Sequence, residues 1–192
     1  MTEKEKMMNK QPVIIVLADG FEETEAVGTA DVLKRIGFPV QLAGLNALLV
    51  TSSAGTKIQA DMLFQEVKWE NAAALVLPGG LPGATNLRDH QSVIDALRRM
   101  HQAGKVIAAI CAAPIVLERA GLTEGKCLTG YPGTNQNLSK LVYTGNRTEC
   151  DGNIVTGKGP GAAFEFGARI AAALKADPTK INAVLDGMFV LR

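Results

Sequence analysis

Two features of this 192-residue chain could do chemistry together: a cysteine at position 111 and a cluster of acids at positions 22–25. Cys111 follows the apolar run 105–110, which is typical of a buried strand, and precedes residues 112–119, which are typical of a helix. A thiol at this corner, the position of a nucleophile elbow, lies near helix N–H groups that favour the thiolate. A free thiol has a pKa of about 8.5 and a polarised site lowers it to about 3.5–7.5, so Cys111 is a candidate nucleophile.

Glu25 is the acid that the sequence places on the sheet side of its helix. On a helical wheel it shares the apolar side with Val32. A carboxylate buried there without a partner costs several kcal/mol, so it must be paired, hydrogen-bonded or protonated. A protonated Glu25 would donate a hydrogen bond to the Cys111 thiolate, and the two groups would titrate as a pair. Glu22 and Glu23 are better explained as first-turn acids that favour the helix dipole.

Main-chain donors for the reaction are predicted at Gly80 and Ala112. The run Pro78-Gly-Gly80 ends a predicted strand, and its backbone can approach a ligand closely. If the Gly80 N–H lies near the sulfur, it forms an oxyanion hole with the N–H of Ala112, the residue after the nucleophile. A plain loop explains the glycines equally well.

Histidine and metal chemistry are not expected. His90 and His101 lie at the two ends of one predicted helix, away from the strand ends, and are expected to be solvated surface residues. This placement argues against a Cys-His dyad. Cys127 and Cys150 have no charged or helix-terminal setting, and the three cysteines show no metal-ligand spacing. We therefore expect no metal and no cofactor.

The charge balance and the length of the apolar runs argue against a nucleic-acid-binding protein and a membrane-spanning protein. Lys plus Arg total 20 and Asp plus Glu total 19, which gives no electrostatic reason to expect binding to nucleic acid or to a membrane surface. The apolar runs are far shorter than the roughly 20 residues that cross a bilayer. Residues 1–12 are polar and are expected to be a flexible tail, with 13–192 as a single domain. Three cysteines without a secretory signal indicate reduced thiols in the cytoplasm.

Strands and helices alternate along the predicted domain. The expected strands are 13–18, 39–43, one or two short strands within 47–60, 73–77, 105–110 and 154–156. The expected helices are 22–36, 90–103 with Asp89 as its cap, 112–119, 162–175 and one that starts at Asp177-Pro178. This order predicts an α/β fold, a doubly wound and mostly parallel sheet with helices on both faces. Ligands of such sheets bind at the carboxyl ends of the strands, where the acids, the Gly-Gly turn and Cys111 should converge.

These motifs together resemble the ThiJ/PfpI superfamily, in particular its branch of the parkinsonism-associated protein deglycase and bacterial YajL. The matching segments are Glu-Glu-Thr-Glu at 22–25, Val-Leu-Pro-Gly-Gly at 76–80, Ile-Ala-Ala-Ile-Cys-Ala-Ala-Pro at 107–114, Gly-Pro-Gly at 159–161 and Phe-Glu-Phe at 164–166. The resemblance implies a flavodoxin-like α/β sandwich that forms a homodimer. It makes Cys111 the oxidation-prone nucleophile and Glu25 its acidic partner. It also places the Gly80 and Ala112 amides around the sulfur, and Gly159 and Pro160 near the pocket.

Two positions depart from the family pattern. Tyr131 stands where the parkinsonism-associated member has a pocket histidine, and a phenol, with a pKa of about 10, is a poorer base at neutral pH. Ala112 stands where the peptidase-like branch has a histidine, so a Cys-His peptidase would lack its base. A glutamine amidotransferase would also need a late histidine, and none follows His101.

Two functions remain. The first is a cofactor-independent glyoxalase or protein deglycase that acts on methylglyoxal, glyoxal or their early adducts with amines and thiols. Cys111 would attack the aldehyde and Glu25 would move the proton. The second is an oxidative-stress sensor or chaperone in which Cys111 is oxidised to sulfenate and sulfinate. Both use the same residues, so the sequence cannot separate them.

Overall fold

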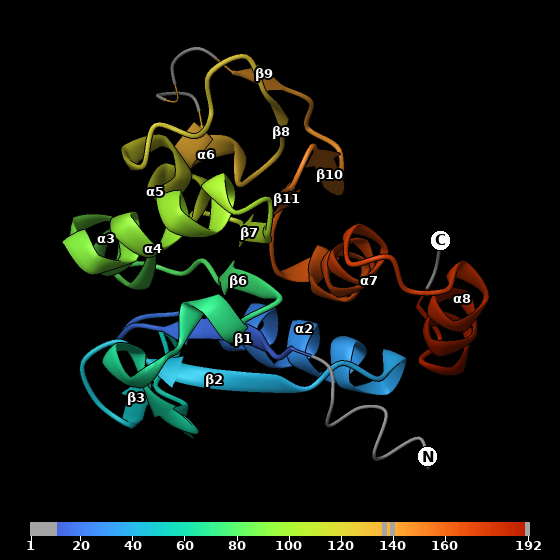
Figure 1. Cartoon of the computed structure of the whole chain (residues 1–192), viewed down its shortest axis with the longest axis horizontal. Helices are drawn as coiled ribbons and strands as arrows, with labels where there is room; N and C mark the ends of the chain where they lie inside the picture. The colour runs from blue at the N-terminus through green and yellow to red at the C-terminus, as the bar shows by residue number, and fades with distance from the viewer. Residues whose placement is uncertain (1–10, 136–137, 139–140, 191–192) are drawn as a thin grey trace.

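The computed structural model describes residues 11–135, 138 and 141–190. Its central sheet contains β1 (Val13–Leu17), β2 (Val40–Gly44), β5 (Met62–Leu63), β6 (Ala74–Leu77), β7 (Val106–Ile110), β10 (Thr148–Asp151) and β11 (Ile154–Gly157). The helices are α2 (Glu23–Ile36), α3 (Gly83–Asp89), α4 (Gln91–Gln102), α5 (Pro114–Arg119), α6 (Pro132–Asn135), α7 (Ala163–Ala173) and α8 (Pro178–Gly187). Two small ribbons pair β3 (Leu49–Thr51) with β4 (Lys57–Gln59) and β8 (Cys127–Leu128) with β9 (Val142–Tyr143). Figure 1 shows these elements.

The order of strands in the sheet is β10-β11-β7-β6-β1-β2-β5. Every neighbouring pair is parallel except β10 and β11. The five main parallel strands, numbered as they occur in the chain, therefore lie in the order 2-1-3-4-5 of a flavodoxin-like fold. The order reverses between β1 and β6, and ligands of such sheets bind outside the carboxyl ends of the strands at that point. The predicted fold class is confirmed.

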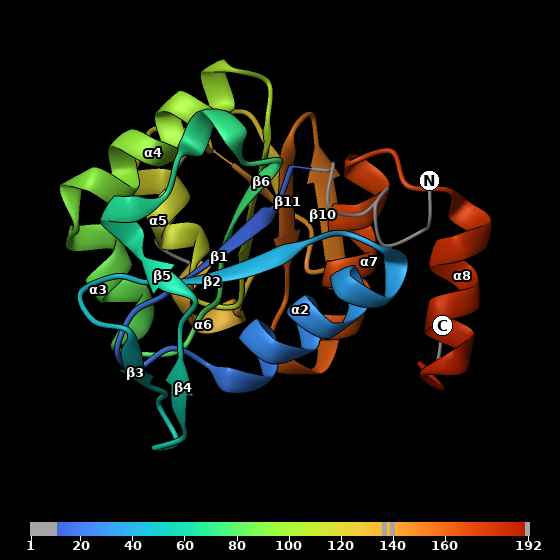
Figure 2. The ribbon, with the colours of Figure 1, turned by 60° about the horizontal axis from the view of Figure 1, so that its bottom comes forward.

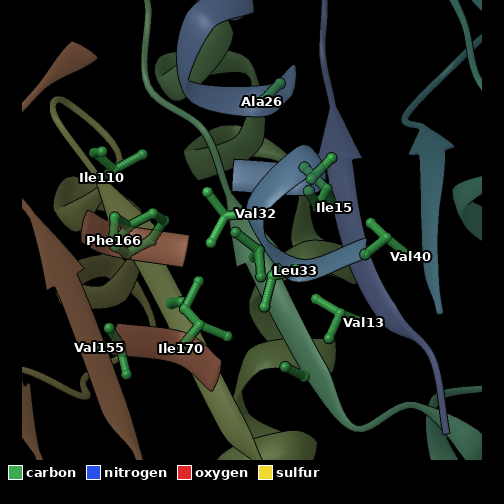
Figure 3. Close-up of a cluster of buried hydrophobic side chains, with 14 of the residues drawn as sticks. Val13, Ile15, Ala26, Val32, Leu33, Val40, Ile110, Val155, Phe166 and Ile170 are labelled. Carbon is green, nitrogen blue, oxygen red and sulfur yellow. The ribbon is translucent and has the colours of Figure 1, made fainter. Parts of the chain in front are cut away.

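The sheet separates two hydrophobic cores. Val13 and Ile15 of β1 face the core under α2 and α7, shown in Figure 3, whereas Ile14 and Val16 face the core under α4 and α5. Figure 2 shows the two groups of helices on opposite sides of the sheet, with α8 outside α2 and α7. Because β1 is covered on both faces, it is a continuous apolar run rather than an alternating one.

The α2 helix follows the sequence prediction closely and carries Glu25. It begins at Glu23 after the N-cap Glu22, and it ends at Gly37, which adopts φ 100° and donates to the carbonyls of Leu33 and Lys34. Such a left-handed residue is the usual end of a helix and suits glycine. The end at Gly37 therefore agrees with the expected boundary.

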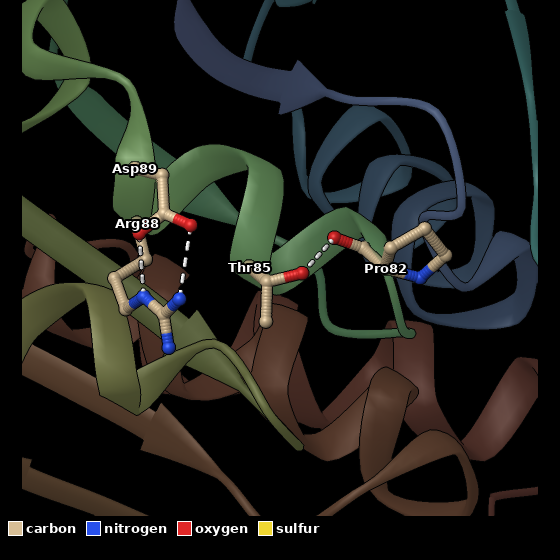
Figure 4. A network of polar contacts seen from close by, with 4 residues as sticks. All are labelled: Pro82, Thr85, Arg88 and Asp89. Carbon is tan, nitrogen blue, oxygen red and sulfur yellow. Dashed lines mark hydrogen bonds and ion pairs between the residues drawn. The ribbon is translucent and has the colours of Figure 1, made fainter.

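The predicted cap of α4 is wrong. Asp89 does not cap that helix, because its carboxylate accepts from Nε and Nη2 of Arg88 at 2.8 and 2.9 Å (Figure 4). His90 is the N-cap and makes no side-chain capping bond. In the preceding helix α3, which the sequence analysis missed, Thr85 Oγ1 donates to the Pro82 carbonyl at 2.7 Å. Asp89 is the last residue of α3, one position before the N-cap of α4, and its carboxylate is bonded to the residue that precedes it.

Other differences concern short or polar elements. Five further elements were not predicted, and each has only two to four residues: β5, β8, β9, β10 and α6. Segments of this length show no readable periodicity. Helix α5 has six residues and begins only at Pro114. Of the predicted tail 1–12, residues 1–10 lie outside the described residues, and the Pro12 carbonyl accepts from Ala73 N–H at 2.8 Å.

No helix in the described part of the chain is both long enough and apolar enough to cross a bilayer.

Candidate active site

Cys111 occupies a strained corner between β7 and α5. Its φ is +61°, a left-handed conformation that is uncommon outside glycine and clusters at functional sites. Its N–H donates to the Gly157 carbonyl at 2.9 Å, and its carbonyl accepts from Tyr131 N–H at 2.7 Å. The side chain is only 9% exposed. Two main-chain bonds therefore hold the backbone of Cys111 in this conformation at the carboxyl end of the sheet.

Glu25 is buried beside this thiol, with 1% of its surface exposed. Its Oε2 accepts from Gly79 N–H at 2.7 Å, whereas Oε1 is buried without a hydrogen-bond partner among the described residues. Burial raises the pKa of Glu25 to about 7, although the Gly79 N–H and a hydrogen bond with Cys111 act in the opposite direction. The carboxyl therefore changes its charge near neutral pH. It is also hydrogen-bonded, which is one of the three states expected of a buried acid from the sequence.

The predicted amides both lie at the sulfur. The N–H groups of Ala112 and Gly80 form hydrogen bonds to the Cys111 sulfur and favour its anion. Burial nevertheless raises the pKa of Cys111 to about 12, and the negative charge of Glu25 and its hydrogen bond act in the same direction. The prediction of a lowered thiol pKa is therefore wrong while Glu25 is ionised. The sequence predicts the amides and the contact with Glu25, but with Glu25 protonated, and it does not predict the burial of the thiol.

Protonation of Glu25 removes that negative charge. The carboxyl titrates at a much lower pH than the thiol. When one of the two groups is ionised near pH 7, it is therefore Glu25 and not Cys111. A carboxylate with a pKa near the working pH is well suited to accept a proton from a thiol and return it later. The pair can therefore supply a thiolate at the moment of reaction without holding one at rest.

Gly79 is a site residue that the sequence analysis did not single out. A Cβ at this position would lie 2.7 Å from Cβ of Cys111, and 2.9 Å from both the Ala112 nitrogen and Oε2 of Glu25. These distances are too short for a side chain, so Glu25 and Cys111 can meet only across a glycine. The Gly-Gly run at 79–80 was the available signal, but only Gly80, with φ +83°, was assigned a role.

A cavity of about 570 Å³ lies beside the thiol corner. Tyr131, Gly159 and Pro160, the predicted pocket residues, line it together with Arg147 and Lys158. Cys111 and Glu25 are not among its lining residues. The cavity is nevertheless next to Cys111, because Tyr131, one of its lining residues, donates its N–H to the Cys111 carbonyl. The phenol is 52% exposed, so Tyr131 forms an open wall.

The remaining candidates lie elsewhere. His90 and His101 are half-buried rather than fully solvated, and Nδ1 of each is buried without a hydrogen-bond partner among the described residues. His90 packs edge-on against Phe64. Cys127 and Cys150 are exposed free thiols. Within residues 11–135, 138 and 141–190, no group of three or more His, Cys, Asp or Glu side chains is placed to hold a metal ion.

The fold and the site define a flavodoxin-like α/β protein with a buried cysteine–carboxyl pair at the switch point of its sheet. The chain belongs to the DJ-1/PfpI family, whose model matches residues 11–173. This confirms the superfamily resemblance.

Named relatives match nearly the whole chain. It is 40% identical over 180 residues to Protein dj-1beta of Drosophila melanogaster, which covers 92% of this chain and 96% of that protein. The crystal structure of Drosophila melanogaster DJ-1beta aligns with a TM-score of 0.90 and 38% identity, over 95% of this chain and 100% of that one. The glutathione-independent glyoxalase DJR-1.2 of Caenorhabditis elegans is 30% identical over 177 residues, covering 92% of this chain and 94% of that protein.

Proposed function

We propose that this protein is a cysteine-dependent glyoxalase or deglycase that acts on small 2-oxoaldehydes such as methylglyoxal and glyoxal, or on their early adducts with amines and thiols. The observation that carries this proposal is the Glu25 carboxyl, buried against Cys111 with a pKa of about 7. The relative named a glutathione-independent glyoxalase supports the same reaction class. The reaction needs side chains and amides of this chain, the substrate and water.

In the first step the Glu25 carboxylate accepts the proton of the Cys111 thiol as the sulfur attacks the aldehyde carbon. The new C–S bond converts the carbonyl oxygen into an oxyanion, and the N–H groups of Gly80 and Ala112 donate to it. Glu25 then returns its proton to that oxygen. The product is a hemithioacetal, and Glu25 is again a carboxylate.

In the second step Glu25 removes the proton from the former aldehyde carbon and delivers it to the neighbouring carbonyl carbon, while the hydroxyl proton of the hemithioacetal passes to the neighbouring carbonyl oxygen. The first carbon is oxidised and the second is reduced, so no external oxidant or reductant is needed. The resulting 2-hydroxyacyl thioester is hydrolysed by water, which releases the hydroxy acid and restores the Cys111 thiol. Methylglyoxal plus water gives lactate, and glyoxal plus water gives glycolate. An early adduct first breaks its bond to the amine or thiol, which leaves with the hydroxyl proton, and the aldehyde that is re-formed then reacts in the same way.

Tyr131, Gly159 and Pro160 are proposed to border the space that the substrate enters. A phenol is a poorer base at neutral pH than the pocket histidine that it replaces. Glu25 is therefore the proposed proton carrier, and Tyr131 is a wall of the pocket.

The test is lactate formation from methylglyoxal in the absence of glutathione. Cys111→Ser and Glu25→Ala should each lower kcat/KM by about 10³-fold or more, because each removes a group without which the steps above stop. Cys127→Ser and Cys150→Ser, which change exposed thiols elsewhere, are the matched controls and should keep wild-type rates. Lactate production unaffected by Cys111→Ser would exclude the mechanism.

A redox sensor or chaperone remains the second candidate, because protonated Glu25 and the two amides would also stabilise an oxidised sulfur. One molecule of hydrogen peroxide converts the thiol to sulfenic acid and releases water, and a second converts the sulfenic acid to sulfinic acid and releases another water. Mass spectrometry after peroxide treatment should then find oxidation at Cys111 before Cys127 or Cys150. Preferential oxidation of the two exposed cysteines would count against this role.

A homodimer in the cytoplasm is part of the proposal. Sedimentation at micromolar concentration should give twice the mass of one chain, and a single-chain mass would contradict the dimer.

A further inference from the structure

Three hydrogen bonds join Glu22, Gly79 and Glu25 into a closed ring. The Glu22 N–H donates to the Gly79 carbonyl at 3.0 Å. The Gly79 N–H donates to Oε2 of Glu25 at 2.7 Å. The Glu25 N–H donates to Oε2 of Glu22 at 2.6 Å and closes the ring. The first turn of α2 and the end of β6 are thereby fixed to each other at the point where the two segments meet Cys111.

Glu22 is more than a first-turn acid that favours the helix dipole. It is the N-cap of α2, with φ −91° and ψ 119°, and its side chain satisfies an N–H that the helix leaves unpaired. That N–H belongs to Glu25 itself. Without the Glu22 carboxyl, the Glu25 N–H would lose this partner. The Glu25 side chain would then be held less firmly toward Gly79.

The charge of Glu22 also acts on Glu25. Among the described residues, the titratable groups that act on the Glu25 carboxyl are Cys111, from the end of β7, and Glu22, from the N-cap of α2. The end of β6 contributes the Gly79 N–H, which lowers the pKa of Glu25, whereas the negative charge of Glu22 raises it. From α7, uncharged Ala163 and Phe164 lie against α2 at Gly28.

We propose that Glu22 is a positioning residue for the Cys111 reaction: its carboxylate orients Glu25 through the ring, and its negative charge helps to keep a proton on Glu25. The inference rests on the proposed function, because Glu25 is the proton carrier there. Glu22 touches neither the sulfur nor the substrate in this mechanism and acts only through Glu25.

The test separates the two contributions of Glu22. Glu22→Gln keeps an oxygen that can accept from Glu25 N–H but removes the charge, whereas Glu22→Ala removes both. Glu23→Gln is the matched control, because Glu23 is the neighbouring acid and bonds Thr56 Oγ1 at 3.0 Å, outside the ring. The titration of Glu25 is followed by its carboxyl infrared band, assigned from its loss in Glu25→Gln, and by the pH profile of lactate formation.

We expect Glu22→Gln to lower the titration midpoint of Glu25 by roughly half a pH unit, the effect of one partly solvated charge nearby. The pH at which kcat changes because Glu25 titrates should shift by the same amount. Glu22→Ala should also lower kcat by roughly tenfold while KM stays within about twofold, because the substrate loses no contact. Glu23→Gln should leave midpoint and kcat at wild-type values.

A wild-type midpoint in Glu22→Gln would overturn the proposal, and so would an equal shift in Glu23→Gln. If Glu22→Gln folds poorly, Glu22→Asp and Glu22→Asn repeat the comparison with two good N-cap residues that differ in charge. Equal midpoints in this pair would overturn it as well. The infrared titration needs no turnover, so it tests the role of Glu22 independently of the reaction. Lactate formation that survives Cys111→Ser would exclude the proposed function without changing the measured midpoints.

Discussion

Glu25 and Asp89 are two carboxylates with strong hydrogen bonds and opposite behaviour. Asp89 is exposed and accepts two bonds from Arg88, which hold its pKa below the ordinary value (Figure 4). Glu25 accepts a main-chain bond from Gly79 of 2.7 Å, yet its pKa is raised to about 7. Hydrogen bonds alone therefore do not decide which carboxyl is charged at neutral pH.

The difference lies in the solvent and in the partner's charge. Arg88 brings a full positive charge to a carboxylate that water still solvates, so ionisation costs little. Gly79 brings only a dipole to a carboxyl that has lost its water, and Glu22 adds a negative charge. A buried carboxyl that lacks a cation can thus gain and lose a proton near neutral pH, which is the property that the proposed reaction needs.

The largest effect on the buried region should come from Gly79→Ala. The added Cβ would meet Cys111, Ala112 and Glu25 at 2.7–2.9 Å, and two of these contacts involve main-chain or Cβ atoms that cannot move aside easily. We expect a loss of about 3 kcal/mol in the free energy of unfolding and loss of lactate formation. Chemical denaturation measures the first. Gly187→Ala, at the end of α8 with open space around it, is the control and should cost almost nothing.

The second effect concerns pH. Since the pKa of Glu25 is raised from 4.5 to about 7, its contribution to stability is fully present below pH 4.5 and is lost as pH rises to about 7. A glutamine at position 25 cannot titrate. The free energy of unfolding of Glu25→Gln, relative to that of the wild type, should therefore rise by about 2–3 kcal/mol between pH 4.5 and 8. Urea unfolding at several pH values measures this difference. A difference that does not change with pH would show that Glu25 is not held as described.

A third effect is on the thiol. Because the negative charge of Glu25 raises the pKa of Cys111, Glu25→Gln should raise the alkylation rate of Cys111 at pH 8 by about tenfold, the change in thiolate fraction for one pKa unit. The same variant should lose lactate formation, since its base is gone. Peptide mass spectrometry resolves Cys111 from exposed Cys127 and Cys150, whose rates should stay unchanged. An unchanged rate at Cys111 would argue against contact between the two groups.

The smallest effect should come from the exposed carboxylate. Asp89 has a lowered pKa, so its contribution is present above its unfolded pKa and is lost as pH falls through the folded value. Asp89→Asn should therefore weaken the protein slightly at pH 7 and not at low pH, opposite in sign to Glu25→Gln. High salt should abolish the difference, because exposed charges are screened. A large loss of stability in Asp89→Asn that salt does not change would contradict this difference between the two acids.

Several residues of the candidate site could be placed from sequence because their signals are local. Cys111 follows a buried strand, Glu25 lies on the apolar side of an amphipathic helix, and the Gly-Gly turn ends another strand. Strand and helix patterns depend on residues within a few positions of one another, so they are readable along the chain. The misassigned cap at Asp89 shows the limit even of local signals, since its neighbour Arg88 took the bond.

The sequence by itself determined the alternation of elements and therefore the edge of the sheet at which the reactive residues meet. Only the tertiary structure decided the charge state of that site, because Glu25 meets Gly79 across 54 residues and the thiol is buried by segments distant in the chain. Ionisation depends on how much water remains around a group and on which charges and dipoles lie within a few ångströms of it. Those neighbours are set by packing, and no pattern of spacing along one segment contains them.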